Sequence, residues 1–148
     1  MEVNHLLLPS YLVELINAGR WEKPENISLL SEMTGVERPE DFSFLLSDRM
    51  ERETNSGYSI VNSGQGYIYG IYSGSDLNST PQSNGFLDVT KSVIIAVNWD
   101  EEVICLDYCE NPNEPSVVLS IYPPTSEGAV QWKVLAKSFR EFAEKLNL

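Results

Sequence analysis

Histidine and cysteine, on which much enzyme chemistry depends, are scarce in this chain. Among 148 residues there is one histidine, His5, and there are two cysteines, Cys105 and Cys109. A single Cys-x-x-x-Cys pair with one distant histidine does not have the spacing of a zinc site. One histidine near the N-terminus also leaves little scope for a Ser-His or Cys-His nucleophile pair. We therefore expect no metal, no cofactor and no enzymatic activity, and we expect Cys105 to be a small buried hydrophobe.

Long hydrophobic runs are missing as well. The longest uninterrupted aliphatic run is Val93–Val97, far below the ~20 residues that span a bilayer. The N-terminal stretch MEVNHLLLPS carries an acid where a signal peptide needs bases, and Pro9 interrupts its short apolar run. These absences predict a cytoplasmic protein with no membrane partner. At 148 residues the chain is most simply one domain, spanning residues 1–148.

Basic residues are few, and the middle of the chain has almost none. The sequence has 22 Asp and Glu against 10 Lys and Arg, which gives a net charge of −12. Between Glu53 and Glu127 there are ten acids and a single base, Lys91. A field of this sign repels nucleic acid and anionic membranes and attracts basic partners. Negative charge also serves solubility alone, and composition by itself favours that simpler interpretation.

Hydrophobic periodicity predicts helices near both ends of the chain. The clearest is the last, where Ser138 and Glu141 form an S-x-x-E capping box and one apolar face carries Phe139, Phe142, Ala143 and Leu146. Three more helices are predicted in the first third, over residues 9–19, 24–35 and 39–53. Residues 57–66 are predicted to be a loop with a short strand at 58–61.

The middle of the chain is rich in strand signals. Residues 92–99 are a continuous apolar run, typical of a strand buried on both faces. An acidic turn at 100–102 leads into a second strand at 103–108, which predicts an antiparallel hairpin. Further strands are predicted at 67–72 and 116–122, with a flexible loop of turn formers at 73–85. This order predicts an α+β fold, a mainly antiparallel sheet covered by N-terminal helices and a C-terminal helix.

Two stretches of the chain, in this order, resemble the SUKH superfamily. SVIIAVNWDEEVICLDYCENPNEPSVV has an apolar strand, an acidic turn, a strand ending in Leu-Asp-Tyr and a Pro-flanked return strand. WKVLAKSFREFAEKL matches a closing helix motif, W-x-x-x-A-x-S-F-x-x-F. The resemblance is good over residues 86–148 and looser before them. The superfamily groups bacterial toxin-immunity proteins with yeast regulators of cell-wall synthesis, so the resemblance implies a non-enzymatic antidote that binds and blocks a cognate protein toxin, commonly a nuclease.

The predicted contact surface combines that expectation with the charge. A nuclease needs a basic groove, and an acidic protein can occupy such a groove as a phosphate mimic. Binding hot spots are enriched in Trp and Tyr, whereas charges at the rim set the association rate. A basic cognate toxin is therefore predicted to contact aromatic residues and their acidic neighbours, namely Trp99, Asp100, Glu101, Glu102, Asp107, Tyr108, Glu110 and Glu114.

Simpler interpretations stay open for several of these residues. Trp99 could cap the core at a strand end, and Asp107 could hold the Pro-rich loop through backbone amides. Trp132 and Phe139 are predicted to be core residues. For the protein as a whole, the main rival is a regulatory protein–protein interaction module of the same superfamily, and a third alternative is a hydrolase that uses two carboxylates.

Overall fold

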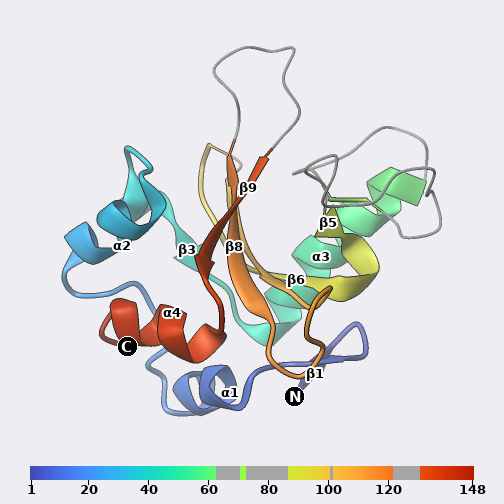
Figure 1. The fold of residues 1–148 in the computed structure, drawn as a ribbon, viewed down its shortest axis with the longest axis horizontal. Helices are drawn as coiled ribbons and strands as arrows, with labels where there is room; N and C mark the ends of the chain where they lie inside the picture. The colour runs from blue at the N-terminus through green and yellow to red at the C-terminus, as the bar shows by residue number, and fades with distance from the viewer. Residues whose placement is uncertain (63–70, 73–86, 101, 122–130) are drawn as a thin grey trace.

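A five-stranded antiparallel sheet forms the centre of the molecule, in the order β3-β6-β7-β8-β9 (Figure 1). This computed structural model describes residues 1–62, 71–72, 87–100, 102–121 and 131–148. The strands are β3 (Ser43–Phe44), β6 (Ser92–Val97), β7 (Val103–Asp107), β8 (Ser116–Ile121) and β9 (Gln131–Ala136). The predicted α+β fold and the predicted hairpin of β6 and β7 are confirmed, with Val97 opposite Val103 at the hairpin end.

The central strands are buried on both faces, as their unbroken apolar sequence predicts. Every residue from Ser92 to Ala96 in β6 and from Val103 to Leu106 in β7 is buried. Helix α3 (Ser47–Asn62) packs against β6 on one side of the sheet (Figure 1). The other side carries α1 (Ser10–Asn17), α2 (Ile27–Thr34) and α4 (Phe139–Lys145) (Figure 1). Cys105 lies in β7 and is buried, which confirms its predicted packing role.

Three of the predicted helices are confirmed with small changes at their ends. They are α1 (Ser10–Asn17), α2 (Ile27–Thr34) and α4 (Phe139–Lys145). Helix α2 ends at Gly35, whose φ of 72° lies in the left-handed region that glycine adopts without strain. Ser138 is the N-cap of α4, and its Oγ accepts a hydrogen bond from the Glu141 amide at 3.2 Å. The Glu141 carboxylate in turn accepts from the amide of Lys137 at 2.9 Å.

The two ends of the chain are joined through aromatic side chains. Trp21 is buried, and its Nε1 donates to the Leu45 carbonyl at 2.9 Å. The centroid of its ring lies 4.5 Å from that of Phe44 and 5.5 Å from that of Phe139, so Trp21 links the sheet to α4. The Tyr11 hydroxyl donates to the Leu148 carbonyl at 3.0 Å, which fastens α1 to the C-terminal end. The predicted core position of Phe139 is confirmed, whereas Trp132 is only partly buried.

The predicted third helix is wrong in its first half. Residues 39–53 were expected to be helical, but Pro39–Asp41 form a 3₁₀ turn and β3 follows it. Ser43 pairs with Val97 and Phe44 with Ala96, so tertiary pairing overrides the helical pattern there. Helix α3 starts at Ser47 and runs to Asn62, so residues 57–62 are helical where a loop with a short strand was predicted. The rest of that predicted loop, residues 63–66, lies outside the described residues. Leu46, an apolar residue within the predicted helix, is exposed.

The N-terminus forms a small antiparallel ribbon that the sequence interpretation missed. Strands β1 (Glu2–Val3) and β2 (Leu6–Leu7) pair across a two-residue turn. Asn4 and His5 occupy that turn with φ of 52° and 67°, the positive values that a tight hairpin turn requires. His5 is exposed at this turn, away from the sheet.

Two further differences concern strands. Residues 132–136 belong to strand β9 and not to the closing helix motif, which begins only after Ser138. Of the strand predicted at 67–72, Ile71–Tyr72 is described as β4, which pairs in parallel with β5 (Leu87–Asp88) ahead of a 3₁₀ turn at Val89–Lys91. The predicted loop at 73–85 lies outside the described residues. None of the described helices combines the length and hydropathy needed to cross a membrane.

Candidate interaction surface

The predicted contact residues divide between the two ends of β7. Residues 98–102, the tip turn, connect β6 to β7, and residues 108–115, the base loop, connect β7 to β8. Five residues of β7, at about 3.3 Å each, separate the two turns by about 17 Å. The tip turn holds Trp99, Asp100 and Glu102, whereas the base loop holds Tyr108, Glu110 and Glu114. Glu101 lies outside the described residues.

Asn98 gives the tip turn a defined shape. Its side-chain Oδ1 accepts hydrogen bonds from the amides of Asp100, at 3.0 Å, and Glu102, at 2.8 Å. The Asn98 amide donates to the Glu102 carbonyl at 3.1 Å, which closes the hairpin. An asparagine that bonds to amides further along the chain is a standard turn-forming device. The tip turn is therefore held by its own hydrogen bonds, and the sequence interpretation missed this role of Asn98.

Trp99 is the most exposed large hydrophobic residue among those described. Its side chain is 84% exposed, so it does not cap the core. Tryptophan side chains in folded proteins usually bury a large surface. At Trp99 the described residues of this chain cover little of the indole. Leaving it in water forgoes roughly 1.5–3 kcal/mol of burial energy, the usual value for a large apolar side chain.

Two carboxylates accompany Trp99 on the tip turn. Among the described residues, neither Asp100 nor Glu102 forms an ion pair. Partial burial raises the pKa of Glu102, the Asn98 hydrogen bond lowers it, and the negative charge of Asp100 raises it further. The balance leaves the ionised form of Glu102 less stable than in water. A cation brought close to this turn would relieve that cost.

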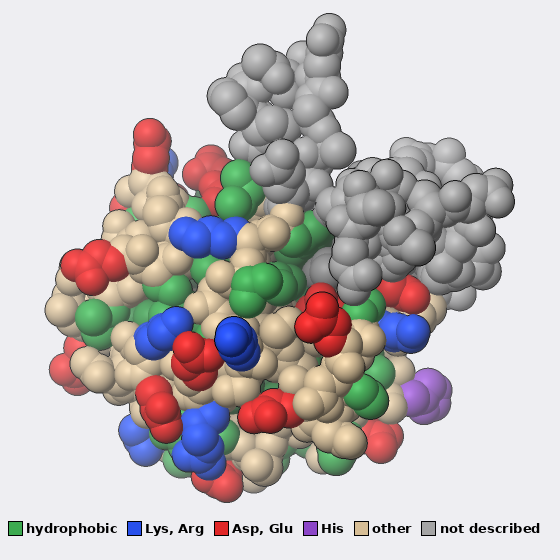
Figure 2. All heavy atoms as spheres, viewed as in Figure 1, with side chains coloured by type: hydrophobic (Ala, Val, Ile, Leu, Met, Phe, Trp, Pro, Cys, Tyr) green, Lys and Arg blue, Asp and Glu red, His purple; other side chains and the backbone are tan. Residues whose placement is uncertain are grey.

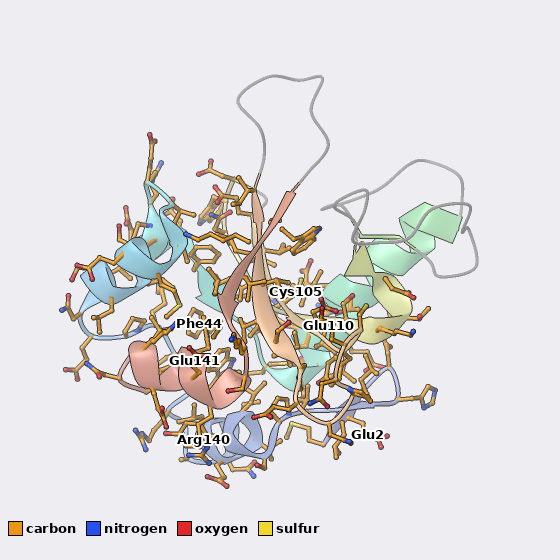
Figure 3. The ribbon with its side chains drawn as sticks, in the orientation of Figure 1. Glu2, Phe44, Cys105, Glu110, Arg140 and Glu141 are labelled. Carbon is orange, nitrogen blue, oxygen red and sulfur yellow. The ribbon has the colours of Figure 1, made fainter. Side chains whose placement is uncertain are left out.

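The base loop uses its polar groups inside the fold. The Asp107 carboxylate, at the end of β7, accepts from the Cys109 amide at 3.0 Å, which supports its loop-holding interpretation. Tyr108 is 3% exposed, and its hydroxyl donates to the Leu7 carbonyl at 2.9 Å. Tyr108 therefore offers almost no surface to a partner, contrary to its place in the predicted contact set. Glu110 and Glu114 are exposed, with Glu110 toward the lower end of the sheet (Figure 3).

The family of the chain follows from comparison with known proteins. A model of the SMI1/KNR4 family (SUKH-1) matches residues 7–145. The chain belongs to the SMI1/KNR4 family. The match takes in both turns and nearly all of the described elements, and the family indicates a protein partner in general. Neither the curated proteins nor the solved structures yield a match.

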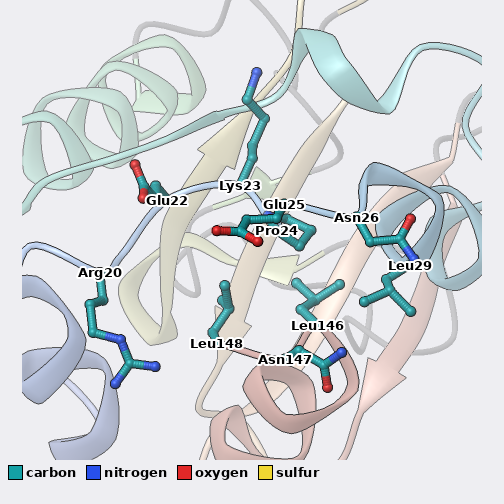
Figure 4. A pocket seen from close by; sticks show the side chains of 10 residues that line it. All are labelled: Arg20, Glu22, Lys23, Pro24, Glu25, Asn26, Leu29, Leu146, Asn147 and Leu148. Carbon is teal, nitrogen blue, oxygen red and sulfur yellow. The ribbon is translucent and has the colours of Figure 1, made fainter.

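The described residues of this SMI1/KNR4 protein line several clefts, including three of about 320–410 Å³. One, of about 320 Å³, lies between the segment 20–29 and the C-terminal end, where Arg20 and Lys23 alternate with Glu22 and Glu25 (Figure 4). A second, of about 410 Å³, lies between the starts of α1 and α4 and the base loop. The third, of about 340 Å³, follows β9. None of the three is lined by histidine or cysteine, and the described residues contain no cluster of three potential metal ligands.

The two thiols of this family member have the properties of packed side chains. Burial, reinforced by the charge of Asp107, raises the pKa of the Cys105 thiol well above its ordinary value. Burial also raises the pKa of the Cys109 thiol to about 12, with a hydrogen bond to Asp107 as the next cause. Because only the thiolate is a good nucleophile, both cysteines are poorly suited to covalent catalysis at neutral pH.

Proposed function

We propose that this protein is a non-enzymatic immunity protein that binds and neutralises a cognate toxin with a basic groove, such as a nuclease. The observation that carries the proposal is Trp99, an exposed indole on a turn shaped by Asn98, with the carboxylates of Asp100 and Glu102 beside it. Hot spots are enriched in tryptophan, and a contact that is already ordered loses little conformational entropy on binding.

The tip turn, and not the base loop, is the proposed contact. Its two described carboxylates are free of ion pairs within the described residues, and one of them is destabilised by partial burial. At the other end of β7, Asp107 and Tyr108, the first residue of the base loop, are committed to internal hydrogen bonds. The two turns lie about 17 Å apart along β7, so charge reversal at each end can be tested separately.

The first test compares charge reversal at the two ends. Asp100→Lys/Glu102→Lys and Glu110→Lys/Glu114→Lys each reverse two carboxylates of similar sequence context. The probe is a toxin domain found in a gene adjacent to that of this protein, and the measurements are the association rate at several salt concentrations and the survival of toxin-exposed cells. We expect the tip-turn pair to slow association, with a loss that shrinks as salt screens the field, and the base-loop pair to have a much smaller effect.

The substitution Trp99→Ala distinguishes a role of the indole in toxin binding from a role in folding. Since the indole is exposed, we expect the free energy of unfolding to change by less than about 0.5 kcal/mol. Loss of a hot-spot anchor should weaken toxin binding by about 2 kcal/mol or more. Equal binding by wild type, Trp99→Ala and the tip-turn charge variant would place the contact elsewhere. Tight binding to a different cellular protein, without protection from any toxin, would instead favour a regulatory interaction module.

A further inference from the structure

Strand β9 gives the central sheet an open edge. It is the last strand in the order and, in the part of the chain that the structure describes, it pairs only with β8. On the outer side of an edge strand, the backbone amides and carbonyls remain free to pair with a further strand. Val134, in the middle of β9, is 60% exposed. An exposed apolar residue on an open edge suits β9 to accept another strand.

A groove of about 340 Å³ follows this edge between α2, β9 and α4. Its walls combine apolar and basic side chains, namely Leu29, Met33, Val134, Leu135, Lys133 and Lys145. Glu32 is the one acid among the residues that line it. An extended segment laid along β9 would therefore have apolar surface beneath it and positive charge beside it.

This side of the molecule departs from the charge of the whole chain. Residues 131–148 contain four bases and two acids, Lys133, Lys137, Arg140, Lys145, Glu141 and Glu144, although the chain carries a net charge of −12. On the face that β9 and α4 present, Lys and Arg side chains are interspersed with Asp and Glu side chains (Figure 2). In this segment the bases therefore outnumber the acids, whereas the charged residues of the tip turn are all acidic.

The two groove lysines lie beside the edge because each is tied to a backbone carbonyl. The Lys133 Nζ donates to the Met33 carbonyl at 3.3 Å, so this side chain reaches across the groove to α2. The Lys145 Nζ donates to the Leu135 carbonyl at 3.3 Å and marks the end of the open stretch. Lysine on an edge strand usually discourages pairing. An acidic segment reverses that effect, because opposite charges on neighbouring strands attract.

We propose that β9 binds an extended acidic segment of another protein, in which apolar residues alternate with Asp or Glu, as an added strand. Backbone pairing with residues 131–134 supplies affinity, apolar side chains cover Val134 and Met33, and carboxylates approach Lys133 and Lys145. A second copy of this chain fits poorly, because two-fold pairing would bring Lys133 from both copies together and join two chains of net charge −12. This surface is separate from the tip turn and does not depend on a toxin.

The test uses an end-capped peptide as long as β9 in which valine alternates with glutamate, and a matched peptide with lysine in place of glutamate. We expect the acidic peptide to bind at least about tenfold more tightly than the basic one at low salt. It should also slow amide hydrogen exchange in β9 and leave exchange in β6 and β7 unchanged. The variant Lys133→Glu/Lys145→Glu should bind the basic peptide more tightly than the acidic one. Val134→Ser should weaken the binding of both peptides.

A matched control reverses two bases away from this edge, in Arg52→Glu/Lys91→Glu, and should preserve the preference for the acidic peptide. All the substituted side chains are exposed. Among the described residues, Lys145 is the one of them that forms an ion pair, with Glu141. Lys133→Glu alone therefore repeats the test in a variant whose fold does not depend on that pair. Equal affinity for the two peptides, or binding without protection of β9, would overturn the proposal. So would a concentration-dependent dimer that itself protects β9, because the occupant would then be a second copy.

Discussion

The turns at the two ends of β7 are both acidic, and they treat their aromatic residue in opposite ways. Trp99 in the tip turn is 84% exposed, whereas Tyr108 in the base loop is 3% exposed. The Tyr108 hydroxyl is bonded to Leu7 in the N-terminal ribbon, and the Asp107 carboxylate holds the chain as it leaves β7. Two stretches of similar composition can therefore serve folding at one end of a strand and leave an aromatic side chain exposed at the other.

The largest expected effect tests the structural end of this comparison. Tyr108→Ala removes a buried aromatic ring, and we expect it to cost about 3–5 kcal/mol of the free energy of unfolding. Chemical denaturation followed by circular dichroism measures this loss. Tyr108→Phe keeps the ring and removes only the hydrogen bond to Leu7, so it should cost about 0.5–1.5 kcal/mol. An unchanged stability of Tyr108→Ala would show that the base loop is not packed as described.

A smaller effect is expected from the residue that shapes the tip turn. Asn98→Ala leaves the amides of Asp100 and Glu102 without their side-chain acceptor. Because water can replace that acceptor at an exposed turn, we expect a loss of about 1 kcal/mol in the free energy of unfolding. If the fixed turn preorganises Trp99, toxin binding should weaken by more than stability does. Asn98→Asp retains an acceptor and is the matched control; if it matched Asn98→Ala in both measurements, the turn would not depend on this hydrogen bonding.

The smallest expected effect concerns pH. The pKa of Glu102 in the folded protein is raised above its ordinary value of 4.5, so the folded state binds a proton more readily than the unfolded state. This group therefore destabilises the fold at neutral pH, and that cost disappears as pH falls through the raised pKa toward 4.5. Glu102→Gln should be slightly more stable than wild type at pH 7, and the two should converge in acid. Melting temperatures across this pH range measure the difference, and parallel curves would contradict the raised pKa.

The sequence predicted the elements whose signals are local or continuous. The apolar run of β6, the turn into β7 and the Ser138 cap of α4 were all confirmed, because each depends on neighbouring residues. The helix predicted over residues 42–46 was wrong because Ser43 and Phe44 pair with β6, about fifty residues further along the chain. That strand pairing outweighs the helical pattern of the local sequence. A single sequence carries no local signal for such a contact.

The candidate contact set was predicted less well than the fold. Composition identified both acidic turns, but it could not show that a five-residue strand puts them at opposite ends or that Tyr108 faces the N-terminal ribbon. Asn98 was overlooked, although an asparagine directly after a strand and before acidic turn residues is a recognisable turn signal. The open edge at β9 was missed because its residues were assigned to a helix motif.

The joining of the two ends through Trp21 and Phe139 has a consequence for how the chain is made. Trp21 leaves the ribosome early, but the ring that packs against it follows more than a hundred residues later. At about 5–20 residues per second, the indole waits on the order of ten seconds for its neighbour. During translation α1 and α2 therefore lack most of the core that shields them, and the final tertiary structure can form only after α4 emerges. A nascent chain stalled before residue 139 should accordingly remain open to proteolysis near Trp21.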